Sequence, residues 1–65
     1  MQIDEKALKR AMAARNFTNA ALARAAGVTN VTIYNLLNHS NRVRIDTVGR
    51  LARALGVDIY DIAKD

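Results

Sequence analysis

The stretch Thr18–Leu37 reads TNAALARAAGVTNVTIYNLL, and its apolar residues recur at helical spacing on both sides of one glycine. Leu22 and Ala26 are four residues apart, so they lie on one face of a first helix. A second helix carries a similar apolar stripe, made up of Ile33, Leu36 and Leu37. Gly27 can adopt the positive φ that ends one helix before the next begins. The stretch therefore predicts two helices crossing around a tight turn, a helix-turn-helix over about residues 18–38.

The outer face of the second helix is polar but uncharged. Residues at positions i, i+1, i+4, i+5 and i+8 form one continuous strip, which we call the recognition strip: Asn30, Val31, Tyr34, Asn35 and Asn38. An asparagine side chain can donate to and accept from adenine in one bidentate contact, and a valine can pack on a thymine methyl group. The strip therefore suits A·T pairs in the major groove of DNA.

Four predicted helix starts share one local signature, an apolar residue, an Asp or Thr cap, and a second apolar residue four positions after the cap. The caps are Asp4, Thr18, Thr29 and Asp58. The cap oxygen accepts a hydrogen bond from a free backbone N–H, and the two apolar side chains pack together. A further helix is expected over about Ile45–Leu55, ending at Gly56, with Gly49 inside it indicating close packing or local strain. The sequence thus predicts an all-α, five-helix orthogonal bundle.

Length and composition narrow the class of protein. Sixty-five residues predict a single domain over residues 1–65 with one modest core and no separate effector domain. The chain has no cysteine and no proline, which excludes disulfides and thiol-based metal sites and suits the reducing cytosol. Polar residues interrupt the longest uncharged tract, and no stretch resembles a signal peptide or a membrane span. We therefore expect a soluble, cytoplasmic protein with no membrane partner.

Positive charge is concentrated in the middle of the chain. The net charge is +4 and the isoelectric point about 10.1. Between Lys6 and Val57 the only acid is Asp46, whereas the other acids stand near the two ends: Asp4, Glu5, Asp58, Asp61 and Asp65. This distribution suggests one face for a polyanion. The alternative is that the basic residues are simply solvated surface.

The same residues resemble the helix-turn-helix of the lambda-repressor-like group, the Cro/repressor or xenobiotic-response-element-type regulators. The group's pattern is roughly Thr-Gln-x-x-Leu-Ala-x-x-Ala-Gly-Val-Ser/Thr-x-x-x-Ile-x-x-Leu. The matching residues are Thr18, Leu22, Ala23, Ala26, Gly27, Val28, Thr29, Ile33 and Leu36. Downstream, DTVGRLARALGVDIYDI over Asp46–Ile62 resembles the group's fourth and fifth helices. The resemblance covers almost the whole chain and implies a lambda-repressor-like domain that binds double-stranded DNA.

The resemblance also implies roles for individual residues. The residues expected to read bases are Thr29, Asn30, Val31, Tyr34 and Asn35. The residues expected to contact phosphate are Asn19, Thr32, Asn38, Arg42 and Arg44. Asn19 stands where the group usually has a glutamine that also braces the second helix, and its shorter side chain puts that bracing in question.

Each role has a structural alternative. Asn35 could be merely solvated, Asn38 could cap the helix C-terminus, and Tyr34 could serve packing alone. His39 replaces the glycine usual in the group and has no second ligand nearby, so it is expected to be a loop residue. We expect no metal and no cofactor.

The residues distinguish among three classes of function. An enzyme is not expected, because one histidine, no cysteine and carboxylates confined to the helix starts and the C-terminus offer no acid–base pair and no activated nucleophile. A protein-interaction module, such as an antirepressor or an antitoxin, can share the same fold. The amide-rich recognition strip flanked by arginines favours a sequence-specific transcription regulator, a small repressor of the kind that phages and mobile elements carry. No small-molecule ligand is expected.

A homodimer is expected, because two domains related by a two-fold axis read half-sites about 34–36 Å apart. The candidate contacts are Val57, Ile59 and Tyr60, with Leu37 as a further possibility. In the alternative, Ile59 and Ile62 close the core of the monomer. A chain this short could also dimerise only on DNA.

Overall fold

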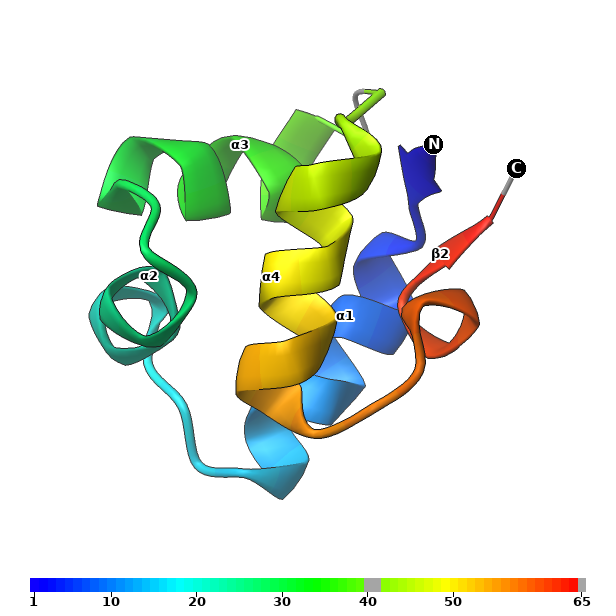
Figure 1. Ribbon diagram of the computed structural model, residues 1–65. Helices are drawn as coiled ribbons and strands as arrows, with labels where there is room; N and C mark the ends of the chain where they lie inside the picture. Colours follow the sequence, from blue (N-terminus) through cyan, green and yellow to red (C-terminus); the bar gives the residue numbers. More distant parts are fainter. Residues whose placement is uncertain (40–41, 65) are drawn as a thin grey trace.

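The computed structural model describes residues 1–39 and 42–64, so Asp65 and residues 40 and 41 lie outside the described residues. In chain order the elements are β1 (Gln2–Ile3), α1 (Glu5–Ala14), α2 (Asn19–Ala26), α3 (Asn30–His39), α4 (Ile45–Leu55), the 3-10 turn η1 (Ile59–Asp61) and β2 (Ala63–Lys64). Figure 1 shows α4 running through the middle of the molecule, with α3 across one end of it. The helix-turn-helix predicted for about residues 18–38 corresponds to α2, the turn and α3.

The four predicted caps are confirmed. Each cap side chain accepts a hydrogen bond from a backbone N–H two or three residues further on, at 3.0 to 3.2 Å. The donors are the amides of Ala7, Ala21, Thr32 and Tyr60. At η1 the Asp61 carboxylate also accepts from the Asp58 N–H at 3.0 Å, which completes a capping box.

Two of the glycines end helices, as predicted. Gly27 after α2 has φ 72° and Gly56 after α4 has φ 70°, both in the left-handed region. The third, Gly49, does not fit the expectation of close packing or strain. Its φ is not positive, and a Cβ built on it would meet no atom within 4 Å.

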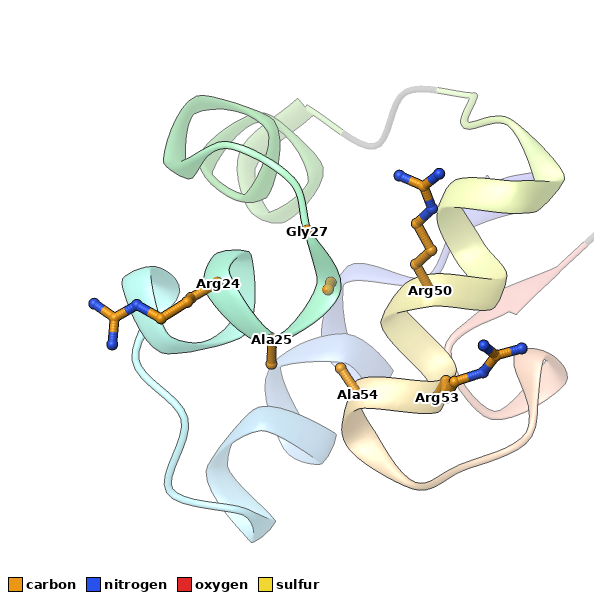
Figure 2. Close-up of a pocket in the computed structure, with 7 residues that line it drawn as sticks. Arg24, Ala25, Gly27, Arg50, Arg53 and Ala54 are labelled. Atoms are coloured by element: carbon orange, nitrogen blue, oxygen red, sulfur yellow. The ribbon is translucent and has the colours of Figure 1, made fainter.

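The core is formed by one apolar face from each helix. The largest fully buried side chains are Ile3, Leu8, Leu22, Ile33, Val48, Leu51, Leu55 and Ile62. α2 packs against both α3 and α4, and α1 packs against α3. Figure 2 shows the junction of α2 and α4, where the small side chains Ala25 and Ala54 stand on facing elements. This packing fixes α3 with its other face outward.

The predicted helical class is confirmed, but the prediction of a fifth α-helix was wrong, and the chain adds one short pair of strands. The described residues contain four α-helices, and the segment after Asp58 makes only η1 before it becomes β2. β2 pairs antiparallel with β1, with Gln2 opposite Lys64 and Ile3 opposite Ala63. The Ile62 carbonyl accepts from the Asp4 N–H at 2.9 Å, so the chain satisfies its backbone across the molecule instead of within a helix. A helix is also costly to nucleate in so few residues.

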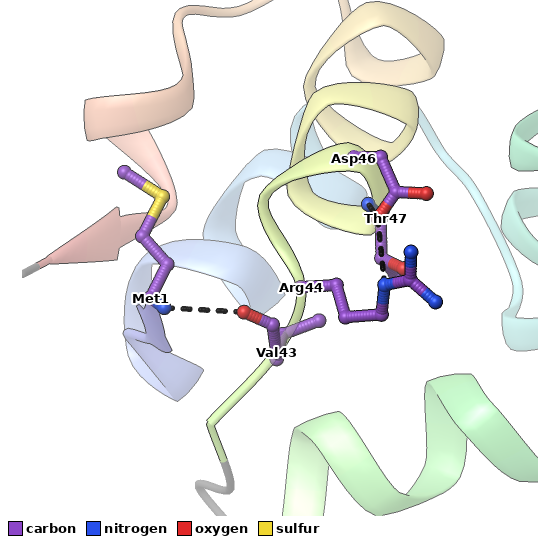
Figure 3. Close-up of polar contacts among 5 residues, drawn as sticks. All are labelled: Met1, Val43, Arg44, Asp46 and Thr47. Carbon is purple, nitrogen blue, oxygen red and sulfur yellow. Dashed lines mark hydrogen bonds and ion pairs between the residues drawn. The ribbon is translucent and has the colours of Figure 1, made fainter.

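The segment that follows α3 is tied to the same small sheet. The Val43 N–H donates to the Met1 carbonyl at 2.7 Å, and the Met1 nitrogen donates to the Val43 carbonyl at 3.1 Å (Figure 3). Gln2 forms an isolated antiparallel bridge with Arg42. Three segments therefore lie side by side: residues 42 and 43, residues 1 to 3, and residues 63 and 64.

Candidate nucleic-acid interface

The outward face of α3 carries the recognition strip. All five of its residues are exposed, Val31 at 66% and Tyr34 at 56%. The opposite face is buried and consists of Ile33, Leu36 and Leu37. The structure therefore brings four of the five predicted base-reading residues, all but Thr29, together on the outward face of α3, and Thr29 is exposed directly before α3. Leu37, which was a further possibility for the dimer contact, has 8% of its surface exposed and packs in the core of the monomer.

The first turn of α3 is held by two threonines. The Thr29 hydroxyl oxygen accepts from the Thr32 N–H at 3.1 Å and shares a second hydrogen bond with the Thr32 hydroxyl at 3.0 Å. Thr29 thus acts as the helix cap. Asn30 and Val31 follow it directly, and their side chains are exposed on the same turn.

The second half of the strip contains internal contacts. The Asn38 Nδ2 donates to the Tyr34 carbonyl at 2.8 Å, so this amide lies back along α3 instead of capping its end. An asparagine amide carries two donor hydrogens, which leaves one for an external acceptor. The Tyr34 ring meets His39 edge-on, with the ring centroids 6.4 Å apart. Asn35 is exposed.

Cations stand beside the C-terminal end of α3. Arg42 and Arg44 are exposed, and Arg44 immediately precedes α4. The Arg44 Nε lies 3.4 Å from Asp46 Oδ1, which also accepts from the Thr47 N–H at 3.0 Å (Figure 3). The side chains of this pair are 86% and 56% exposed, so the pair contributes about 1 kcal/mol or less. Its outer guanidinium nitrogens remain available to an anion.

Asn19 is exposed at the first residue of α2. Among residues 1–39 and 42–64 no hydrogen bond joins its side chain to α3, so the described structure contains no bracing contact from it. Asn19 stands in the first turn of α2, where the backbone N–H groups of a helix favour anions.

Sequence reasoning missed Ile45. Helical spacing places it in line with Val48 and Leu55, which are buried, yet 69% of Ile45 is exposed. It is the first residue of α4, at the end of that helix nearest α3 (Figure 1), and no neighbouring element covers it there. Periodicity predicts which face a residue lies on, but not where the covering elements end.

The family model described as the Cro/C1-type helix-turn-helix DNA-binding domain matches residues 7–65 of this chain. No curated protein matches this chain. Within the described residues, no helix has both the length and the apolar character needed to cross a membrane.

Two kinds of protein are among the solved structures with the same fold. PhpD with cadmium and a variant of hydroxyethylphosphonate dioxygenase are each 32% identical over 100% of this chain, with TM-scores of 0.83 and 0.84. The chain spans only 14% of each of those proteins. The hypothetical transcription factor NHTF from Neisseria is 17% identical over 94% of this chain and 78% of its own, with a TM-score of 0.78, which shows the shared fold.

Proposed function

The chain belongs to the family of Cro/C1-type helix-turn-helix DNA-binding domains, and from this premise we propose that it is a sequence-specific transcription regulator, a single domain that occupies an operator as a small repressor. The observation that carries the proposal is the two-sided character of α3. One face of this helix is buried in the core, and the other exposes amides, a hydroxyl and one aliphatic side chain. The major groove of B-DNA admits an α-helix with such a face.

Base reading is proposed for the first two turns of α3. Asn30 and Asn35 would each make a bidentate contact with adenine, and Val31 would pack on a thymine methyl group. Each good contact of this kind discriminates by about 1–3 kcal/mol. Tyr34, whose ring contacts His39, and Thr29, which caps α3, are proposed to contact bases at the edge of the site.

Phosphate contacts are proposed for the residues around the strip. Arg42 and Arg44 would bind the backbone on one side and Asn19 on the other, at the start of α2. Thr32 and Asn38 would add hydrogen bonds from α3 itself. Such contacts position the domain and supply affinity without reading sequence.

A homodimer is proposed to form through the segment after α4. Tyr60 on η1 is 64% exposed, and Val57 and Ile59 are only partly buried against the core. Ile62 is fully buried, so it closes the monomer core. Two copies related by a two-fold axis would place their α3 helices in successive major grooves. The proposed setting is the cytoplasm, as for a phage or mobile-element regulator.

An alternative is a protein-interaction module of the antirepressor or antitoxin type. The observation in its favour is that two large apolar side chains, Val31 and Tyr34, are exposed on the recognition strip. We do not propose for this chain the dioxygenase activity named for one larger similar protein, because the chain spans only 14% of that protein.

In vitro selection from random duplex DNA tests the proposal, followed by titration of the selected site against scrambled DNA at near-physiological salt. Enrichment of a two-fold symmetric site containing A·T pairs is expected. Weak binding that depends only on salt, without any enriched sequence, would overturn the proposal in favour of the protein-interaction module.

A further inference from the structure

A groove lies between the end of α2 and α4 (Figure 2), and no residue of the recognition strip lines it. It has a volume of about 500 Å³. Small residues, including Ala25, Gly27 and Ala54, line it together with three arginines. We call this surface the basic groove and define it by its cations, Arg24, Arg50 and Arg53.

The three arginines have no internal partner in the part of the chain that the structure describes. All three are exposed, and none makes an ion pair or a side-chain hydrogen bond there. The carboxylates of Asp4, Asp58 and Asp61 are engaged at element starts, and Asp46 pairs with Arg44. The positive charge of the basic groove is therefore uncompensated within the described structure.

The position of the groove separates it from the recognition strip. α4 begins beside the end of α3 and runs away from it (Figure 1). Arg53 follows Ile45 by eight residues, which places it about 12 Å further along the helix. A duplex held against the outward face of α3 would therefore lie beyond the opposite end of α4 from Arg53, whereas the Arg50 guanidinium points toward the end of α4 that is nearer to α3 (Figure 2).

The directions of the side chains indicate an extended ligand. In Figure 2 the guanidinium groups of Arg24, Arg50 and Arg53 point in three different directions instead of converging on one point. One small anion would engage only one of them. A chain of carboxylates could engage all three, because arginine binds carboxylate in a planar two-bond geometry.

We propose that the basic groove binds an acidic segment of a partner protein. Glutamate and aspartate side chains of that segment pair with Arg24, Arg50 and Arg53, while its backbone passes over the small side chains between them. Complementary charge would speed the encounter and select against basic partners. This inference goes beyond DNA binding, and its test requires no operator.

The test uses a fluorescein-labelled twelve-residue peptide of alternating glutamate and alanine, with fluorescence anisotropy as the readout. Replacing Arg24, Arg50 and Arg53 together by alanine should weaken binding by about tenfold. The matched control replaces Lys6, Lys9 and Arg10, three exposed cations of α1, and so removes the same charge. The control should change binding by less than about twofold, because these three cations lie on α1 and do not line the groove. Thermal unfolding by circular dichroism checks that both variants remain folded.

Backbone amide shifts in NMR locate the peptide independently of the variants. Saturable changes at Ala25, Gly27 and Ala54 are expected, and a peptide with glutamine in place of glutamate should give none. Equal weakening in the two triple variants would overturn the proposal, because binding would then follow net charge. It would also be overturned if the groove variant kept peptide affinity but lost duplex affinity with a salt slope lower by about 3, which would identify three phosphate contacts.

Discussion

Asn30 combines exposure with a fixed backbone. It is the first residue of α3, directly after the Thr29 cap, so its amide projects from a rigid turn. We predict that Asn30→Ala relaxes base preference at one position of the selected site by about 1–3 kcal/mol and leaves the other positions unchanged. Repeating the selection with the variant measures this. An unchanged preferred site would show that α3 docks differently.

Arg44 differs from Asn30 because its contact is expected to be with phosphate. Arg44 forms an ion pair with Asp46, but both side chains are largely exposed. The pair is therefore weak, and the guanidinium is free to contact DNA. Arg44→Ala should weaken binding to all sequences alike and lower the salt slope by about 1. Titrations at several salt concentrations check this against Lys9→Ala, an equal charge loss on α1. Equal slopes in the two variants would remove Arg44 from the interface.

Among the elements, α4 offers a matched pair of glycines, one inside the helix and one at its end. Gly49→Ala should raise the free energy of unfolding by up to about 1 kcal/mol, because alanine favours the helix and meets no atom there. Gly56→Ala should lower it by about 1–2 kcal/mol, because φ is 70°. The new Cβ would also lie 2.8 Å from the Arg15 guanidinium, which donates to the Leu55 carbonyl. Urea denaturation measures both, and a shift of the same sign would refute this reading.

The elements also show what the sequence could and could not predict. Caps and glycine stops were predictable because each depends on residues within a few positions of one another, as with Thr18 and Ala21. The β1–β2 pair was missed because its partners, Gln2 and Lys64, are at opposite ends of the chain. For the site, periodicity predicted which residues of α3 face outward. It could not predict the hydrogen bond from Asn38 to Tyr34, which depends on a rotamer.

For the whole molecule, stability depends on a single small core. Leu51 is fully buried and Ile45, on the same helix, is 69% exposed. Leu51→Ala should lower the free energy of unfolding by about 2–5 kcal/mol and the melting temperature by about 10 °C or more. Ile45→Ala should change the free energy by less than about 0.5 kcal/mol. Calorimetry compares the two, and similar losses would mean that Ile45 is covered in solution.

The pairing of Gln2 with Lys64 places the first and last strands of the domain next to each other. Strand partners lie about 5 Å apart, so the chain leaves the domain almost where it entered. This domain could therefore be inserted into a loop of a host protein, because its two ends are close enough to join the two ends of the cut loop. The junction would lie next to Arg42, through its bridge to Gln2, so an inserted domain would carry its host close to the end of α3.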